Sequence, residues 1–259
     1  MDLSVFDPIG LAPVLVAPAV GSLLGVLIRR LPRGAPVALA RSCCEACSTA
    51  LGPLELVPLL SWLWLRGRCR HCRAPIDRFH VGIELAAGAV AAWAVWTAGD
   101  DTLRAWLGCG LGWTLLALAW IDLEWLILPD VLTLPLLLCG LAATWITVPD
   151  SLGEGALADS ALGAVLGWLV FASVAAGYRA LRGRDGLGGG DAKLLAAAGA
   201  WLGWQALPQV MLLAAVAALG GAATLRLVRG RAFAGIKLAF GPWLAMAIWL
   251  VWLYGDVPG

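Results

Sequence analysis

Charged side chains are scarce in this 259-residue sequence. They make up 14% of it, hydrophobic residues make up 61%, and the mean hydropathy is +0.86. Several apolar runs reach the roughly 20 residues that cross a bilayer as a helix. The scarcity of charge therefore excludes a soluble globular protein and predicts a polytopic membrane protein in a lipid bilayer. The formal net charge of +1 says little by itself, and we expect no nucleic-acid partner.

A basic stretch is missing before the first apolar run, where Asp2, Asp7 and Pro8 stand instead. A cleavable signal peptide begins with such a basic stretch. The pattern of a cleaved signal is therefore absent, and residues 1–30 are expected to hold the first transmembrane helix.

Eight apolar runs predict an all-α membrane protein with about eight transmembrane helices. The runs are 8–28, 81–98, 104–121, 131–149, 157–178, 192–206, 208–225 and 238–254. The sixth run is short, and Pro208 separates it only weakly from the seventh. Small residues fill the runs at 196–200 and 214–218, and such residues let membrane helices pack closely.

The basic residues predict the orientation of these helices. All of them except Arg104 fall at residues 29–80, 179–193 or 226–237, and eight spans place these three loops on one side. The positive-inside rule makes that side cytoplasmic and puts both termini outside. We therefore expect a multi-pass membrane protein with the acids at 122, 130 and 191 at its cytoplasmic face.

Two C-x-x-C pairs, separated by 21 residues, stand in the segment 31–80, which is the one sizeable soluble piece. Four thiolates in two such pairs suit tetrahedral zinc, and a small piece with little core needs such a staple. The predicted ligands are Cys44, Cys47, Cys69 and Cys72. Residues 81–259 then form the transmembrane core.

Other roles for these cysteines are less favoured. A redox pair would fit the C-x-x-C spacing, but a thioredoxin-like pattern is absent, and cytoplasmic thiols are kept reduced. Cys43 and His71 could also bind metal, and we expect them to be bystanders.

Two acids stand at predicted helix ends. Asp191 closes the glycine-rich stretch Gly186–Lys193, where glycines allow close backbone approach and positive φ, and an ionisable group at membrane depth suggests a function. The alternative is that Asp191 only caps the following helix. Asp122 lies near the C-terminus of a helix, where the helix dipole disfavours negative charge, so capping does not explain it.

Together these residues resemble the type IV prepilin peptidases, which are membrane aspartyl proteases. The match runs nearly end to end. It rests on the segments 21–32, 44–47, 58–62, 66–72, 81–85, 122–130, 188–193 and 240–245. The paired cysteine motifs, Asp122 and the G-x-G-D motif ending at Asp191 are specific in combination. Gly25 stands where the family usually has Asn, so that residue's role does not carry over.

The resemblance implies that Asp122 and Asp191 are the catalytic pair. It implies a place in the bacterial inner membrane, and substrates that are type IV prepilins and type II secretion pseudopilins, cut after a glycine. It also implies N-methylation of the new N-terminus with S-adenosylmethionine, for which the sequence offers no residues. Hydrolysis needs one carboxylate to activate water and one acid to donate a proton. From the helix dipoles, with Lys193 adding to the bias, we expect Asp191 to be the base and Asp122 the acid.

Two other functions remain open at this point. The chain could be a non-enzymatic membrane assembly factor whose zinc module docks a partner, or a thiol redox carrier. Among the remaining acids, Asp130 is expected to cap the fourth span rather than act directly. Glu84 fits a helix-packing or polar-border group, and Glu124 a solvated loop acid.

Overall fold

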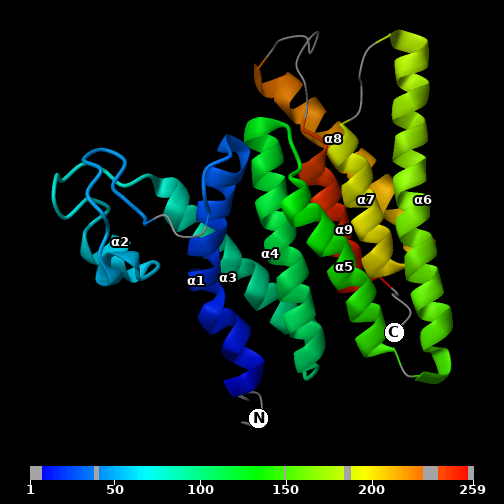
Figure 1. Cartoon of the computed structure of the whole chain (residues 1–259), viewed down its shortest axis with the longest axis horizontal. Helices are drawn as coiled ribbons and strands as arrows, with labels where there is room; N and C mark the ends of the chain where they lie inside the picture. The colour runs from blue at the N-terminus through cyan, green and yellow to red at the C-terminus, as the bar shows by residue number, and fades with distance from the viewer. Residues whose placement is uncertain (1–7, 38–40, 149, 184–187, 230–238, 256–259) are drawn as a thin grey trace. The chain divides into compact units, whose positions relative to one another are not determined.

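The computed structural model describes residues 8–37, 41–148, 150–183, 188–229 and 239–255. Apart from two isolated β-bridges, regular structure in these residues is helical (Figure 1). Gly186 and Leu187 of the glycine-rich stretch, and the basic residues Arg184, Arg231 and Lys237, lie outside them. The all-α prediction is confirmed.

Eight helices correspond to the eight predicted spans. They are α1 (Pro8–Arg30), α3 (Arg78–Ala98), α4 (Thr102–Trp125), α5 (Asp130–Thr147), α6 (Asp150–Arg182), α7 (Gly189–Leu202), α8 (Leu207–Arg229) and α9 (Gly241–Tyr254). The short α2 (Leu60–Trp64) and the 3-10 helices η2 (Leu31–Arg33), η3 (Pro53–Leu56) and η4 (Trp204–Ala206) complete the described elements.

Only six of these helices are long and apolar enough to cross a bilayer, namely α1, α3, α4, α5, α6 and α8. Helices α7 and α9 have 14 residues each. At 1.5 Å per residue they measure about 21 Å, well short of the roughly 30 Å hydrocarbon core. Helices α7 and α9 are therefore shorter than a full span, and the predicted count of about eight transmembrane helices is approximate.

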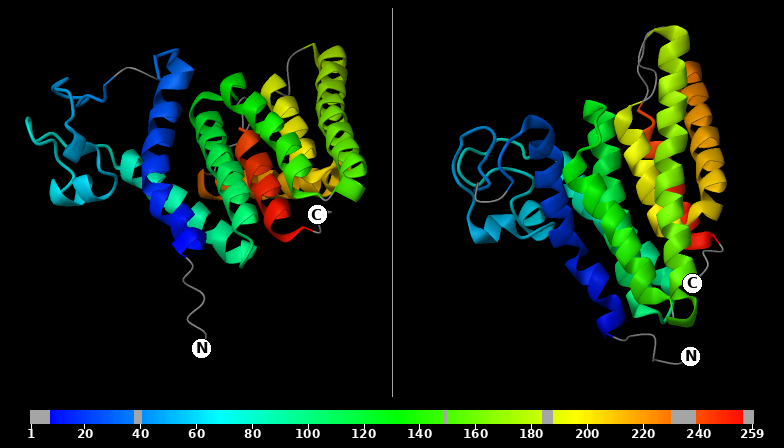
Figure 2. Two further views of the ribbon diagram at one scale, coloured as in Figure 1. Left: turned by 60° about the horizontal axis from the view of Figure 1, so that its bottom comes forward. Right: turned by 45° about the vertical axis from the view of Figure 1, so that its right-hand side comes forward.

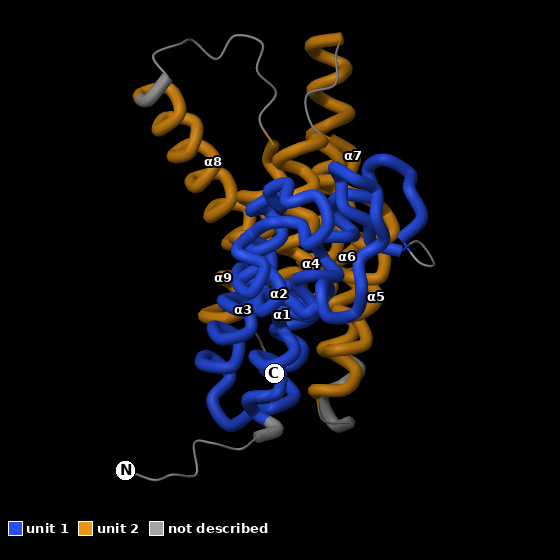
Figure 3. Tube along the Cα trace, turned by 90° about the vertical axis from the view of Figure 1, so that its left-hand side faces the viewer, with its two compact units in different colours: residues 1–113 blue, residues 114–259 orange. Residues whose placement is uncertain are grey.

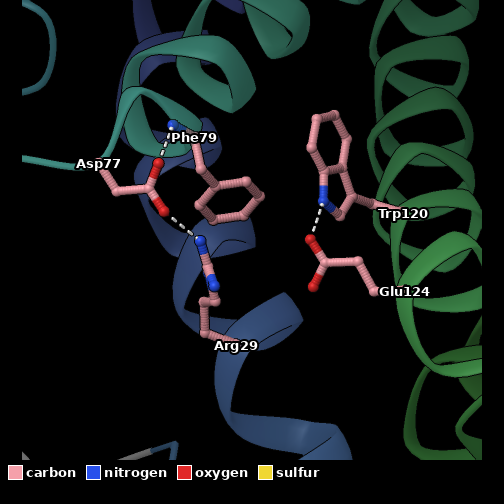
Figure 4. A network of polar contacts seen from close by, with 5 residues as sticks. All are labelled: Arg29, Asp77, Phe79, Trp120 and Glu124. Atoms are coloured by element: carbon pink, nitrogen blue, oxygen red, sulfur yellow. Dashed lines mark hydrogen bonds and ion pairs between the residues drawn. The ribbon is translucent and has the colours of Figure 1, made fainter.

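The chain divides into two compact units, residues 1–113 and 114–259 (Figure 3). In the first unit α1 packs along α3. The closest approach is at Gly21, where an added Cβ would stand 2.5 Å from Glu84 Cα. At one end of this helix pair, Asp77 accepts a 3.0 Å hydrogen bond from Phe79 N and pairs with Arg29 (Figure 4). The predicted division at residues 30 and 80 stays a prediction.

In the second unit α7 is the central helix and packs against α5, α6 and α9. Every residue from Leu194 to Leu202 is buried. Small residues allow this close packing: an added Cβ on Gly199 would meet Gly163 O at 2.1 Å, and one on Gly167 would meet Leu195 O at 2.5 Å. Because neighbouring helices surround α7, it need not reach across the bilayer to be stable.

Candidate active site and metal centre

Asp191 lies in the first turn of α7 and its side chain is buried, with 7% of the residue exposed. Gly188 is the N-cap, and no side-chain cap bond is present there. Asp191 is therefore not the N-cap residue itself, although its carboxylate interacts with the backbone N–H of Gly188. The carboxylate stands among the free N–H groups of a helix N-terminus, where the helix dipole favours negative charge.

Gly190 makes room for the loop between α4 and α5. An added Cβ would stand 2.8 Å from Leu128 Cβ, whereas one on the neighbouring Gly189 would meet nothing within 4 Å. None of Gly188, Gly189 and Gly190 is among the positive-φ residues. The described part of the glycine-rich stretch is thus explained by close approach at Gly190, and the expected positive φ is absent there.

Asp122 lies in the last turn of α4, as predicted, and is 6% exposed. Its Oδ2 accepts a 2.9 Å hydrogen bond from the N–H of Gly241, the first residue of α9. An added Cβ on Gly241 would stand 2.7 Å from that same oxygen. Asp122 therefore faces the N-terminus of α9 as well as ending α4.

The two carboxylates lie near enough for their negative charges to repel each other. They come from positions far apart in the sequence, yet both belong to the second unit and both are buried. Each also stands at the N-terminal end of one of the two short helices. A pair of buried, mutually repelling carboxylates can hold one proton between them near neutral pH, which is the state that supports general acid–base chemistry.

An ion pair involves Lys193, two residues after Asp191 in the sequence. Lys193 Nζ donates to Asp130 Oδ1, which joins the first turns of α7 and α5. Pro129 is the N-cap of α5 and Asp130 its first helical residue, so the expectation that Asp130 caps this helix is wrong. Lys193 is directed to Asp130, which weakens the argument that it biases Asp191.

The other two acids have local partners. Glu124 is exposed but belongs to α4 rather than to a loop, and it accepts a 2.8 Å hydrogen bond from Trp120 Nε1 (Figure 4). Glu84 is buried in α3 and accepts a 2.8 Å hydrogen bond from Leu59 N. Of the two roles expected for Glu84, this burial favours the helix-packing role over the polar-border role.

Sequence reasoning missed Leu128 and Gly241 as parts of this site. Both stand in segments that the resemblance includes, Leu128–Asp130 and Phe240–Ala245. Their contacts with Gly190 and Asp122 depend on tertiary packing, so motif spacing alone could not reveal them.

The predicted zinc ligands come together in the first unit. The four Sγ atoms of Cys44, Cys47, Cys69 and Cys72 all lie within 4.8 Å of one another. A regular tetrahedron with Zn–S bonds of about 2.3 Å has edges of about 3.8 Å, and the Cys44–Cys72 Sγ distance is 3.8 Å. The cysteine set therefore fits a four-coordinate metal ion. Cys43 and His71 are outside the cluster, as expected.

Two similar turns hold these cysteines. Cys44 N donates to Thr49 O and Ser48 N to Cys44 O, and in the second turn Cys69 N donates to Ala74 O and Arg73 N to Cys69 O. Ser48 and Arg73, each four residues after the first cysteine, both have left-handed φ, 56° and 60°.

The first turn also supports the thiolate form that binds metal. The Thr49 hydroxyl, 3.3 Å from Cys47 Sγ, lowers the pKa of that thiol to about 6. Thiolates are the metal-binding form of cysteine, so this contact favours metal binding.

The fold defines a multi-pass helical membrane protein with two buried carboxylates in its second unit and a four-cysteine cluster that could hold a metal ion. Two family models match: that of the bacterial peptidase A24 N-terminal domain over residues 15–98, and that of the type IV leader peptidase family over residues 109–223. The chain belongs to the type IV leader peptidase family. The predicted family is confirmed.

Curated relatives agree with this assignment. A prepilin leader peptidase/N-methyltransferase of Aeromonas hydrophila is 45% identical over 218 residues, which cover 83% of this chain and 72% of the relative. Proteins of the same name from Burkholderia pseudomallei and Pseudomonas aeruginosa are 44% and 37% identical and cover 87% and 95% of this chain. The matches cover 79% and 90% of those two relatives. No solved structure matches the chain.

Proposed function

We propose that this chain cleaves the leader peptide from type IV prepilins and type II secretion pseudopilins, with Asp122 and Asp191 as its catalytic pair. The observation that carries the proposal is that two buried carboxylates from distant parts of the chain stand at the N-termini of α7 and α9, near enough to interact electrostatically. Structural acids buried in a membrane helix commonly pair with a cation, and among the described residues neither acid forms an ion pair.

The chemistry follows from one proton shared by two acids. The ionised carboxylate takes a proton from water, which attacks the carbonyl carbon of the scissile peptide bond. The protonated acid gives its proton to the developing oxyanion. When the tetrahedral intermediate collapses, the acid that took the water proton gives it to the leaving amine, and the other acid takes a hydroxyl proton of the intermediate, so the pair returns to its starting state. Titration belongs to the pair rather than to either acid.

The helix dipoles no longer support the expectation that Asp191 is the base and Asp122 the acid. That argument treats Asp122 as facing only the C-terminus of α4, but Gly241 of α9 donates a hydrogen bond to it. Both acids therefore stand beside a helix N-terminus. We keep the pair as the catalytic unit and assign the first proton to neither member.

The placement of the site suits a substrate that is itself a membrane helix. We propose that the chain lies in the inner membrane with the acids at its cytoplasmic face, as the positive-inside rule predicts. A prepilin whose hydrophobic segment crosses the same bilayer would then present the end of that segment to the two acids.

We propose that the metal is zinc and that it is structural. Four cysteine ligands close the tetrahedral shell and leave no position for a substrate or water. Zinc would hold the two turns of the first unit together in a segment with little apolar core, and Cys69 is the one buried cysteine among the four.

Methylation of the new N-terminus is proposed from the names of the relatives. A groove between α6 and α7 has a volume of about 210 Å³ and is lined mainly by alanine and glycine, with Trp168 and Arg179. This is below the roughly 300 Å³ of typical small-molecule sites, and the groove offers few polar groups to bind a cofactor. We assign no residues to that cofactor.

Cleavage of a purified prepilin tests the proposal. The full chain in nanodiscs is mixed with a prepilin, with and without S-adenosylmethionine, and the products are analysed by mass spectrometry. We expect loss of the leader in both cases and one added methyl group only with the cofactor. An intact prepilin would instead favour the non-enzymatic assembly factor.

A further inference from the structure

A group of large apolar side chains is exposed on the four-cysteine module, outside every helix that could cross a bilayer. Trp64 is 75% exposed, Leu63 69% and Leu60 66%. Together with three further side chains they form what we call the α2 surface, defined by Leu54, Leu56, Val57, Leu60, Leu63 and Trp64. Exposed apolar residues on transmembrane helices contact lipid, but these residues lie on η3, on α2 and between them, so they need another explanation.

The contact that anchors this segment gives its depth in the bilayer. Leu59, the N-cap of α2, donates its N–H to Glu84 Oε2 at 2.8 Å. Glu84 lies seven residues beyond Asp77, the N-cap of α3, which at 1.5 Å per residue is about 10 Å along the helix. The Asp77–Arg29 pair marks the charged end of the α1–α3 hairpin.

The same depth follows from α1. Glu84 packs on Gly21, which precedes Arg29 by eight residues, or about 12 Å of helix. Helical side chains lean toward the N-terminus of their helix. The Glu84 carboxylate therefore lies less than these roughly 10–12 Å from the end that holds the Asp77–Arg29 pair. Leu59 is therefore held on the bilayer side of the hairpin's charged end.

The arrangement of the first unit agrees with this depth. In both views of Figure 2 and in Figure 1 the module with α2 lies beside the C-terminal half of α1 rather than beyond its end. The backbone also fixes the direction of α2, because Leu59 before it and Arg66 after it both have left-handed φ, 59° and 52°.

The charge around this surface suits lipid headgroups. Exposed arginines follow α2 closely at Arg66, Arg68, Arg70 and Arg73. Basic residues near a membrane are attracted to anionic headgroups, and interfacial helices bury their apolar face roughly 5–10 Å into the headgroup and acyl boundary. That depth matches the position of Leu59.

We propose that the α2 surface inserts into the interface of an anionic bilayer, so that the four-cysteine module is a monotopic membrane element rather than a free cytoplasmic domain. Leu60, Leu63 and Trp64 contact acyl chains, and the arginines contact headgroup phosphates. The insertion does not depend on the peptidase activity and would hold in a catalytically inactive chain.

Fluorine NMR on the full chain tests this insertion. The chain is labelled with 5-fluorotryptophan and placed in nanodiscs of phosphatidylethanolamine and phosphatidylglycerol. The resonance that disappears in Trp64→Phe is that of Trp64, and the one that disappears in Trp62→Phe is that of Trp62. Trp62 is the matched control, because it is half-buried and packs against Gly67, where an added Cβ would stand 3.0 Å from its ring.

Two relaxation agents then separate the outcomes. A lipid with a nitroxide near its headgroup should broaden the Trp64 resonance beyond detection and affect Trp62 less, while a soluble gadolinium chelate should leave Trp64 visible. Broadening of Trp64 by gadolinium alone would mean a water-exposed surface, and broadening by neither agent would mean a protein cover. Either result overturns the proposal.

The charge of the lipid provides the second arm. In nanodiscs of phosphatidylcholine alone, the nitroxide lipid should broaden the Trp64 resonance less, because the arginines lose their anionic partners. Equal broadening in phosphatidylcholine would contradict the proposal that the arginines bind anionic lipid headgroups. Zinc content, measured on every sample, verifies that the module is folded.

Discussion

A single methyl group at Gly190 should disturb the active site, whereas the same group at Gly189 should not. An added Cβ at Gly190 would stand 2.8 Å from Leu128 Cβ, but carbon atoms in contact prefer about 3.5–4.0 Å. Relief of the overlap needs a shift of roughly 1 Å between the first turn of α7 and the loop after α4. Asp191 is the next residue, so the shift acts directly on a carboxylate that we propose to be catalytic.

The magnitude follows from two effects. Overpacking of this kind costs about 1–3 kcal/mol of stability, and a misplacement of about 1 Å at a catalytic group costs up to roughly 100-fold in rate. Gly190→Ala should therefore lower kcat for prepilin cleavage by roughly 10- to 100-fold. Gly189→Ala meets nothing within 4 Å and should keep wild-type kcat.

The assay is initial-rate cleavage of a prepilin in nanodiscs, with zinc content and the thermal midpoint measured for both variants. A Gly190→Ala enzyme as active as Gly189→Ala would refute the reasoning, since the contact with Leu128 would then not set the position of Asp191. Equal losses in the two variants would refute it as well.

Three further changes have definite expected outcomes. Gly241→Ala places a Cβ 2.7 Å from Asp122 Oδ2 and should reduce kcat by up to about 100-fold, so near-wild-type cleavage would contradict the hydrogen bond's importance. Cys69→Ser should lose the zinc and lower the thermal midpoint, whereas the matched buried Cys109→Ser should retain it, as metal analysis would reveal. The Asp191→Ala variant should not cleave a prepilin but should still methylate a pre-cleaved N-terminal peptide, because methyl transfer from a sulfonium does not need that carboxylate. If the variant binds S-adenosylmethionine but methylates nothing, the two activities share one site.

Much of the fold could be predicted because bilayer length and apolar runs are local properties of the sequence. The eight helices lie close to the eight apolar runs. The lengths of α7 and α9 could not be predicted in this way, because their stability depends on burial among other helices rather than on crossing the bilayer. The sequence shows α7 as an apolar run of small residues, and only the structure reveals α5, α6 and α9 around it.

The sequence could predict that the four cysteines cluster, but it could not predict the contacts around Asp122 and Asp191, whose catalytic role stays a prediction. The clustering of Cys44, Cys47, Cys69 and Cys72 follows from two spacings that each fit one metal ion. The Gly241 N–H bond to Asp122 and the Lys193–Asp130 pair join residues that are 119 and 63 positions apart. Such pairs depend on how helices pack, so helix dipoles along the chain could not predict the surroundings of Asp122.

The central claim is that Asp122 and Asp191 act as one catalytic unit, and a double-mutant cycle tests it most directly. Single-turnover cleavage of a prepilin is measured for Asp122→Asn, Asp191→Asn and the double variant, with zinc content as the check on folding. Residues that act as a unit are strongly non-additive, so each single variant should be as inactive as the double. Substantial cleavage by either single variant, or losses that multiply in the double variant, would contradict the account.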